Sequence, residues 1–163
     1  MDEWRPDKEW SDAFLPEIKH VLGVHLIGEA PVEDDQQRNT DLIVLKMDAV
    51  RIGCRVRRPK YLDRYADEFT IRAGRPSGAK TELTKIVEGW GDYLFYGIAA
   101  PDEADLACWL LGDLKAFRLW FNRRLAEGHR PWQCQQNHDG SSDFLAFKIA
   151  DLGPDFIVAQ KIA

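Results

Sequence analysis

The sequence has few cysteines and no long hydrophobic run, and both shortages restrict the class of protein. Its three cysteines, Cys54, Cys108 and Cys134, are odd in number, far apart and without a CxxC pair. This spacing argues against a disulfide framework and against a zinc knuckle. No apolar run reaches the ~20 residues that a membrane helix needs, and the first five residues, MDEWR, are too polar for a secretory signal. We therefore expect a cytoplasmic protein that does not enter a membrane.

Most familiar catalytic motifs are also missing. The chain has no P-loop, no GxGxxG after an expected strand, no HExxH and no GxSxG. The histidines occur in unrelated contexts, and we interpret each of them as structural: His20, His25, His129 and His138. A Cys/His nucleophilic site has no local support. A function must therefore be sought in the arrangement of charged residues.

The apolar content is large enough for one hydrophobic core. Hydrophobic residues make up 45% of the 163 residues, a length in the usual range of a single domain. We expect one domain over residues 1–163, with a core at about 12–98 and a C-terminal extension at 101–163. No internal repeat, low-complexity tract or clean interdomain linker interrupts this plan.

Hydrophobic periodicity predicts an α/β fold with an αβββαβ core. A helix over 12–22 is followed by strands at 41–47, 50–58 and 68–72, a helix at about 80–89 and a strand at 93–98. These elements are expected to form a mixed central sheet flanked by helices. In the extension, the acidic residues after Pro101 favour the start of a long helix that runs to about Leu125. Two strands at 144–149 and 156–159 are expected to close the chain as a β-hairpin.

One expected strand concentrates positive charge. Residues two apart on a strand face the same side, so Arg51, Arg55 and Arg57 share one face. Three guanidiniums on one face repel each other and cannot enter a core without partners, so an anion must meet them. Between positions 51 and 64, six basic residues against one acidic residue give a balance of +5, which leaves −10 elsewhere within the net charge of −5. This basic strip fits a focused anion site or neutralisation by the acidic segment 29–41.

Two neighbouring strands carry a resemblance to a known family. Asp41 opens one expected core strand, and Arg55-Val56-Arg57 lies on the next. The order of elements over about 14–98 resembles the core of the PD-(D/E)xK nuclease superfamily, the restriction-endonuclease-like fold. In that superfamily an Asp opens one core strand, and an acidic residue and a Lys lie two apart on the next. Asp41 matches, whereas the arginines replace the second pair, which removes a metal ligand and adds positive charge where a cation belongs.

The resemblance implies a divalent-metal-dependent phosphodiesterase that acts on DNA, as small nucleases of phages and mobile elements do. Such families are known to move the missing carboxylate to a neighbouring element, and Glu82, three residues before Lys85, is the best candidate. The implied catalytic residues are Asp41, Glu82 and Lys85. Asp41 and Glu82, together with Glu17 on the first helix, would hold Mg²⁺ or Mn²⁺. The implied nucleic-acid contacts are Arg51, Arg55, Arg57, Arg58, Lys60, Arg72 and Lys80.

Two other interpretations stay open at the level of sequence. In the first, acidic residues pair with the arginines across the sheet without any metal, namely Asp41, Glu82 and Glu68 with Arg55, Arg57 and Arg72. Such a domain would bind nucleic acid without cutting it, with Arg and Lys on phosphates and Tyr61 or Tyr65 for stacking. In the second, the acidic segment 29–41 binds a protein partner in an inhibitor-like role. The sequence does not define the oligomeric state.

Overall fold

The computed structural model describes residues 4–29, 42–44 and 50–162, and the chain divides into two compact units, residues 1–50 and 51–163. The first unit contains the helices α1 (Trp4–Asp12) and α2 (Leu15–Leu26) and the antiparallel strand pair β1 (Ile27–Glu29) and β2 (Leu42–Val44). The helix expected over 12–22 is confirmed as α2. None of the described helices is long and apolar enough to cross a membrane. The expectation of a single domain over 1–163 stays a prediction.

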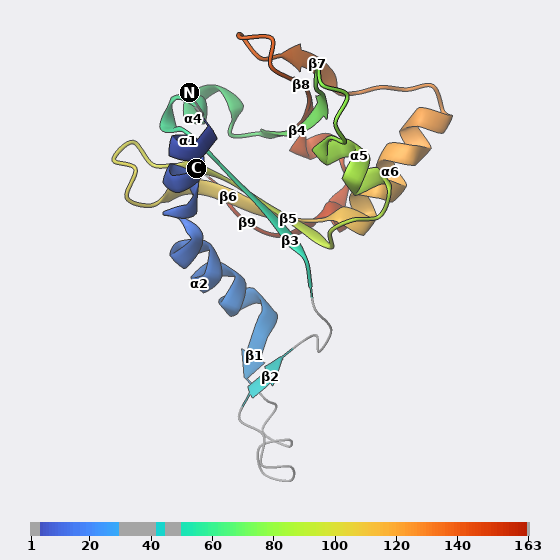
Figure 1. The fold of residues 1–163 in the computed structure, drawn as a ribbon. Coiled ribbons are helices and arrows are strands. Elements are labelled where there is room, and N and C mark those ends of the chain that lie inside the picture. Colours follow the sequence, from blue (N-terminus) through green and yellow to red (C-terminus); the bar gives the residue numbers. More distant parts are fainter. Residues whose placement is uncertain (1–3, 30–41, 45–49, 163) are drawn as a thin grey trace. The chain divides into compact units, whose positions relative to one another are not determined.

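The second unit contains a mixed four-stranded sheet (Figure 1). Its strands are β3 (Ile52–Arg57), β5 (Tyr93–Ala99), β6 (Leu106–Asp113) and β9 (Ile157–Lys161), in the order β3-β5-β6-β9. β3 runs parallel to β5, and the other two pairs are antiparallel. The strands expected at 50–58 and 93–98 are confirmed by β3 and β5.

A separate three-stranded sheet completes the β-structure of the second unit. It contains β4 (Glu68–Gly74), β7 (Gln133–Gln136) and β8 (Asp143–Lys148), in the antiparallel order β4-β8-β7. The α/β class and a mixed sheet are therefore confirmed, but the expected place of the strand at 68–72 in that sheet is wrong, because β4 pairs with β8 and not with β3 or β5. Local alternation identifies a strand but not the strand with which it pairs.

Side-chain caps fix the helices of the second unit. α5 (Glu82–Val87) begins after Thr81, whose hydroxyl accepts a hydrogen bond from the Thr84 N–H at 3.3 Å. α6 (Leu114–Ala126) begins after Asp113, whose carboxylate accepts from two backbone N–H groups at 2.7 and 3.0 Å. Both are N-cap residues of the preferred types. Short turns of helix complete the unit: η1 (Pro59–Tyr61), α4 (Leu62–Tyr65), η2 (Ile149–Asp151) and η3 (Pro154–Phe156).

The long helix expected from Pro101 to about Leu125 is wrong in its first half. Residues 106–113 form β6, and only the second half, α6, is helical. The apolar run in β6 is buried on both faces of a central strand, so its hydrophobic residues also satisfy a helical period. The cap at Asp113 marks the true start of the helix.

The expected closing hairpin is also wrong. The predicted strands at 144–149 and 156–159 exist as β8 and β9, but β8 belongs to the three-stranded sheet and β9 to the four-stranded sheet. Between them, η2 and η3 carry the chain from one sheet to the other. Leu152 and Phe156 in this crossing are buried, so apolar contacts and not a hairpin turn fix its path.

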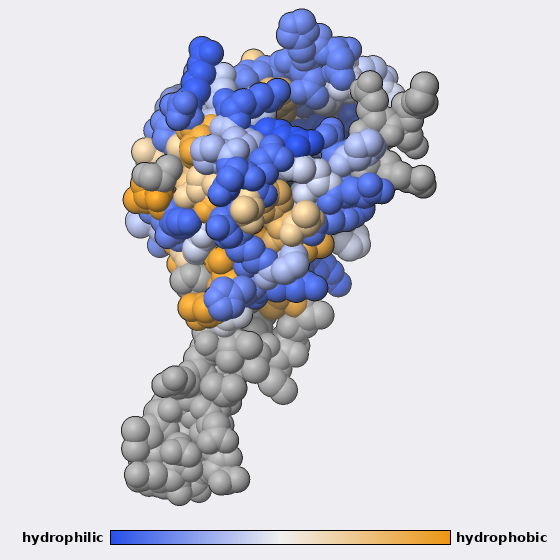
Figure 2. Space-filling view, turned by 90° about the vertical axis from the view of Figure 1, so that its left-hand side faces the viewer, coloured by the Kyte–Doolittle hydropathy of each residue, from blue (hydrophilic) through white to orange (hydrophobic). Residues whose placement is uncertain are grey.

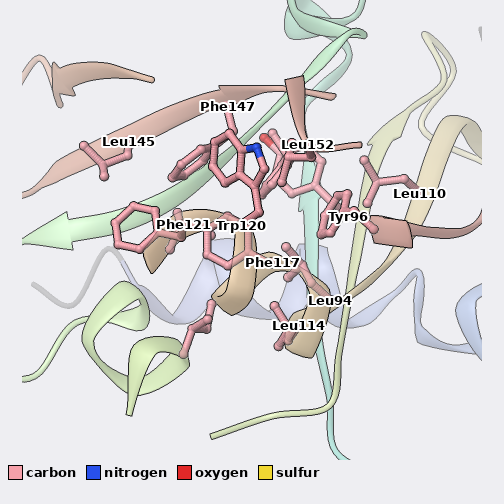
Figure 3. Packing of buried hydrophobic residues seen from close by; sticks show 14 residues of the cluster. Leu94, Tyr96, Leu110, Leu114, Phe117, Trp120, Phe121, Leu145, Phe147 and Leu152 are labelled. Atoms are coloured by element: carbon pink, nitrogen blue, oxygen red, sulfur yellow. The ribbon is translucent and has the colours of Figure 1, made fainter. Parts of the chain in front are cut away.

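An aromatic core joins the two sheets and α6 (Figure 3). Phe69 of β4 stacks on Phe147 of β8 and on Phe156, with ring centroids 5.4 and 5.3 Å apart. Phe117 of α6 contacts Phe147 edge-on at 5.2 Å. Full burial of such a side chain stabilises the fold by about 1.5–3 kcal/mol. The outer surface is different, since the face in Figure 2 mixes hydrophilic and hydrophobic residues.

Gly112 allows this core to close, and its substitution gives a first test. A Cβ at Gly112 would collide with the ring of Phe156, whereas a Cβ at Gly53 of β3 would lie 3.9 Å from the nearest Leu94 carbon. We expect Gly112→Ala to lower the free energy of unfolding by about 1–3 kcal/mol through overpacking. Gly53→Ala, the matched control, is expected to change it by less than about 1 kcal/mol. Urea denaturation measures both, and equal midpoints for the two variants would contradict this account of the core.

Candidate functional site

The basic face of β3 is directed at β4 of the other sheet. Val56 is buried, and its two neighbours Arg55 and Arg57 extend to the opposite side of the strand, as the alternation predicts. Both arginines bind Thr70 of β4: Arg55 donates to its carbonyl oxygen at 2.9 Å, and Arg57 donates to its hydroxyl at 2.8 Å. The two guanidiniums therefore bridge the two sheets, and their further partners differ.

Arg55 is neutralised by an acid. Its Nη2 donates to Oε2 of Glu82 at 2.6 Å, and the same oxygen accepts from the backbone N–H of Arg72 at 3.2 Å. Both members of the ion pair are partly buried, with side chains 26% and 29% exposed. Burial, followed by repulsion from Arg55 and Arg75, lowers the pKa of Arg72 from its ordinary value, although Glu82 opposes this shift. The Glu82 carboxylate thus binds the guanidinium of Arg55 and the backbone N–H of Arg72.

The predicted metal ligands belong to separate parts of the chain. Glu82 already binds Arg55 and the Arg72 backbone, Glu17 lies on α2 of the first unit, and Asp41 lies outside the described residues. Across residues 4–29, 42–44 and 50–162, no group of three or more His, Cys, Asp or Glu residues is placed to hold one ion. The predicted Mg²⁺ or Mn²⁺ site stays a prediction. Lys85, the third predicted catalytic residue, is exposed on α5.

The other predicted phosphate contacts are divided between paired and open positions. Lys80 binds Glu88 at 2.8 Å, and Arg58 binds Glu103 at 3.5 Å. The backbone N–H of Arg51 donates to Asp92 at 2.8 Å, and its side chain is exposed. Lys60 is exposed, with its ammonium 5.2 Å from the centroid of the Tyr61 ring. Lys60 and Arg51 are therefore more accessible to a ligand than Lys80 or Arg58.

Arg57 is held by neutral groups. Its Nη1 donates to the hydroxyls of Thr70 and Tyr96, at 2.8 and 3.1 Å, and its guanidinium carbon lies 4.1 Å from the centroid of the Tyr61 ring. Thr70 and Tyr96 are buried, and their oxygens are 3.3 Å apart, so they form a fixed support. In the part of the chain that the structure describes, no carboxylate forms an ion pair with Arg57. Two hydroxyls and a ring thus fix the position of Arg57, and no described carboxylate forms an ion pair that offsets its charge.

A cavity of about 350 Å³ opens beside Arg57, between the two sheets of the second unit. Tyrosines and amide side chains predominate among the twelve residues that line it: Arg57, Tyr61, Tyr65, Glu68, Thr70, Tyr96, Ile98, Gln135, Gln136, Asn137, His138 and Phe144. Glu68 is the acidic residue of this lining, and its carboxylate binds Lys148 at 3.2 Å. The same ammonium binds Asp67 at 3.0 Å, so it offsets the Glu68 charge only in part, and Arg57 is the guanidinium of this lining.

The sequence analysis predicted no strand and no site at residues 135–138, which form one wall of the cavity. These residues end β7 and begin the turn into β8. Asn137 N–H donates to the carbonyl of Ser142 at 2.9 Å, and Ser141 N–H donates to the Asp139 carboxylate at 2.9 Å. The hydrogen bonds from Ser141 lower the pKa of Asp139. The signal for this hairpin was present, because an Asp-Gly pair at 139–140 is typical of such turns.

Comparisons with protein-family models, with curated proteins and with solved structures find no match to this chain. The resemblance to the PD-(D/E)xK core therefore depends on Asp41 and on the order of elements alone. It stays a prediction.

The Arg55–Glu82 pair provides a second test. Glu82→Gln keeps the shape of the side chain but removes the charge that opposes Arg55 and Arg72. We expect the free energy of unfolding to fall by about 1–3 kcal/mol, the usual contribution of a hydrogen bond to a charged group. Glu88→Gln is the control at the opposite, C-terminal end of α5, where the exposed pair with Lys80 contributes about 0–1 kcal/mol. Urea denaturation of both variants measures this, and equal losses would contradict a structural role for Glu82.

Proposed function

We propose that the second unit binds nucleic acid without cleaving it, with Arg57 as the principal phosphate contact. The observation that carries the proposal is that Arg57 borders the cavity, is fixed by Thr70 and Tyr96, and has no carboxylate partner among the described residues. A buried or half-buried guanidinium without a counter-ion costs free energy, so a bound anion would stabilise it. The ligand therefore supplies the negative charge that the neighbouring residues do not.

The hydrogen-bonding capacity of Arg57 supports a phosphate as that anion. A guanidinium has five N–H donors in a planar fork. One nitrogen, Nη1, donates to Thr70 and to Tyr96. The remaining donors, on Nη2 and Nε, are free of partners among the described residues. Two parallel N–H groups on one edge of the fork match two oxygens of a phosphate, which is the strongest geometry for this pair.

The neighbours of Arg57 favour a polymer over an isolated phosphate. Arg64 lies over the ring of Tyr65 at 5.6 Å, and Lys60 lies beside Tyr61 at 5.2 Å. Alternating cations and tyrosines at these positions suit a chain in which phosphates and bases also alternate. This arrangement supports the nucleic-acid interpretation of the basic strip.

We prefer binding without cleavage because the Glu82 carboxylate is already paired with Arg55. The Glu82 carboxylate is 2.6 Å from a guanidinium nitrogen of Arg55, so a divalent cation at Glu82 would be repelled by Arg55. The sheet expected from the nuclease resemblance also differs from the observed one, in which β4 is separate from β3 and β5. Metal-dependent cleavage depends on Asp41, and it remains the alternative supported by the sequence resemblance.

Loss of Arg57 tests the phosphate contact. Arg57→Ala is expected to weaken binding to a fluorescent oligonucleotide by about tenfold or more and to reduce the salt slope of binding by about one. Anisotropy titrations between roughly 50 and 200 mM salt measure both quantities. The control is Arg123→Ala, which removes the same charge from an exposed position on α6 and is expected to leave affinity nearly unchanged. Equal affinities and slopes for the two variants would overturn the proposal.

The absence of cleavage has its own test. We expect plasmid and single-stranded DNA to stay intact when the protein is incubated with Mg²⁺ or Mn²⁺, because Glu82 is occupied by Arg55. Gel electrophoresis over time measures this, and Asp41→Asn is the comparison variant. Metal-dependent cleavage that Asp41→Asn abolishes would replace the binding proposal with the nuclease prediction.

A further inference from the structure

We propose that the cavity beside Arg57 receives one unstacked base of a single strand, so that the protein prefers single-stranded to double-stranded nucleic acid. This inference rests on the proposed function, because it takes Arg57 as the contact to the phosphate attached to that base. It goes further by assigning the cavity to the base and by naming the residues that would contact its ring and its edges.

The volume of the cavity agrees with this occupant. At about 350 Å³ it lies at the low end of the range, roughly 300–1,000 Å³, that is typical of pockets for small ligands. A base that is paired and stacked in a duplex cannot enter such a pocket unless it leaves the stack, which costs a few kcal/mol. An unpaired base avoids most of this cost. The cavity therefore discriminates between the two forms by shape.

Aromatic side chains can contact the faces of the base. Tyr61 has Arg57 over its ring at 4.1 Å, so this ring already has a partner. Tyr65, whose ring centroid lies 6.1 Å from that of Tyr61, and Phe144 of β8 also line the cavity. Stacking of a base on an aromatic ring contributes about 1–3 kcal/mol and is available to every base. Tyr65 is the stacking residue that we test.

The opposite wall supplies polar groups for the edges of the base. The amide nitrogen of Asn137 donates to the hydroxyls of Ser141 and Ser142, at 3.3 and 2.8 Å. These bonds orient the Asn137 side chain and leave its carbonyl oxygen as an acceptor. Gln135 donates through its amide nitrogen to the Gln133 side chain at 3.4 Å, which likewise leaves its carbonyl oxygen. Amide side chains recognise the amino and ring nitrogens of bases, which a bare anion does not possess.

Charge also favours a base with its phosphate attached. Lys148 binds Glu68 at 3.2 Å and Asp67 at 3.0 Å, so its single charge offsets part of the carboxylate charge in the cavity wall. Arg57 borders the same cavity and keeps one edge of its guanidinium available among the described residues. The faces of the base can then be contacted by the tyrosines, its edges by the amide side chains of Gln135 and Asn137, and the phosphate by Arg57.

The experiment compares one labelled strand, the same sequence as a duplex and a mononucleotide competitor. The wild type is expected to bind the single strand at least about tenfold more tightly than the duplex, and more tightly than the mononucleotide. Tyr65→Ala and Gln135→Leu are expected to weaken single-strand binding by roughly five- to hundredfold, the range that corresponds to stacking on one base. Both variants are expected to leave duplex binding nearly unchanged, because a paired base does not enter the cavity.

Controls keep the inference separate from the proposed function. Gln160→Leu makes the same change on the exposed edge strand β9 and is expected to have no effect on either ligand. Thermal melts identify any variant that fails to fold, and Gln135→Leu remains informative if Tyr65→Ala unfolds. Arg57→Ala is expected to weaken both ligands, since both carry phosphates.

Three results would overturn the inference. Equal affinities for strand and duplex, combined with a loss in Arg57→Ala, would exclude the base pocket and leave the proposed function intact. Tighter binding of the mononucleotide than of the strand would assign the cavity to a free nucleotide. Failure of every nucleic acid to bind would remove both proposals.

Discussion

The two sheets of the second unit share no strand pair, so side chains alone must hold them together. The aromatic core provides most of this contact through Phe69, Phe147 and Phe117. Beside it, Arg55 and Arg57 reach from β3 to Thr70 of β4. These polar bridges are directional, whereas the aromatic contacts are not, and they fix the distance between the sheets where the cavity opens. The site is thus a consequence of how the fold closes.

Two arginines on one strand face have different roles because their partners differ. Arg55 binds a carboxylate, which compensates its charge within the protein. Arg57 binds two hydroxyls and a tyrosine ring, which orient the guanidinium, and no carboxylate among the described residues forms an ion pair with it. Breaking the Arg55–Glu82 pair leaves a charged side chain without its counter-ion. Arg57, in contrast, can accept an external anion with little rearrangement of its side chain. Preorganisation of this kind favours affinity, since the side chain is already ordered before the ligand arrives.

The sequence predicts local features of this site well and its assembly poorly. Alternation on β3 correctly placed Arg55 and Arg57 on one face, and the apolar run of β5 was recognisable. Pairing between distant strands is not encoded in a local pattern, so β4 was assigned to the wrong sheet. The run at 106–113 satisfied a helical period because a central strand is apolar on both faces. The wall formed by residues 135–138 was also missed, because only the tertiary fold brings these residues near Arg57.

If the second unit binds nucleic acid as proposed, the charge of the whole chain favours a contribution from the cavity over one from a basic surface alone. The strip at 51–64 carries +5 and the rest of the chain carries −10. At distances where both act together, the net charge of −5 repels a polyanion. Screening limits this repulsion to about 10 Å at 0.1 M salt. A phosphate contact made against such a background contributes less than it would in a basic protein. Stacking and amide contacts do not depend on net charge, and for this reason recognition of a base is the more effective source of affinity in an acidic protein.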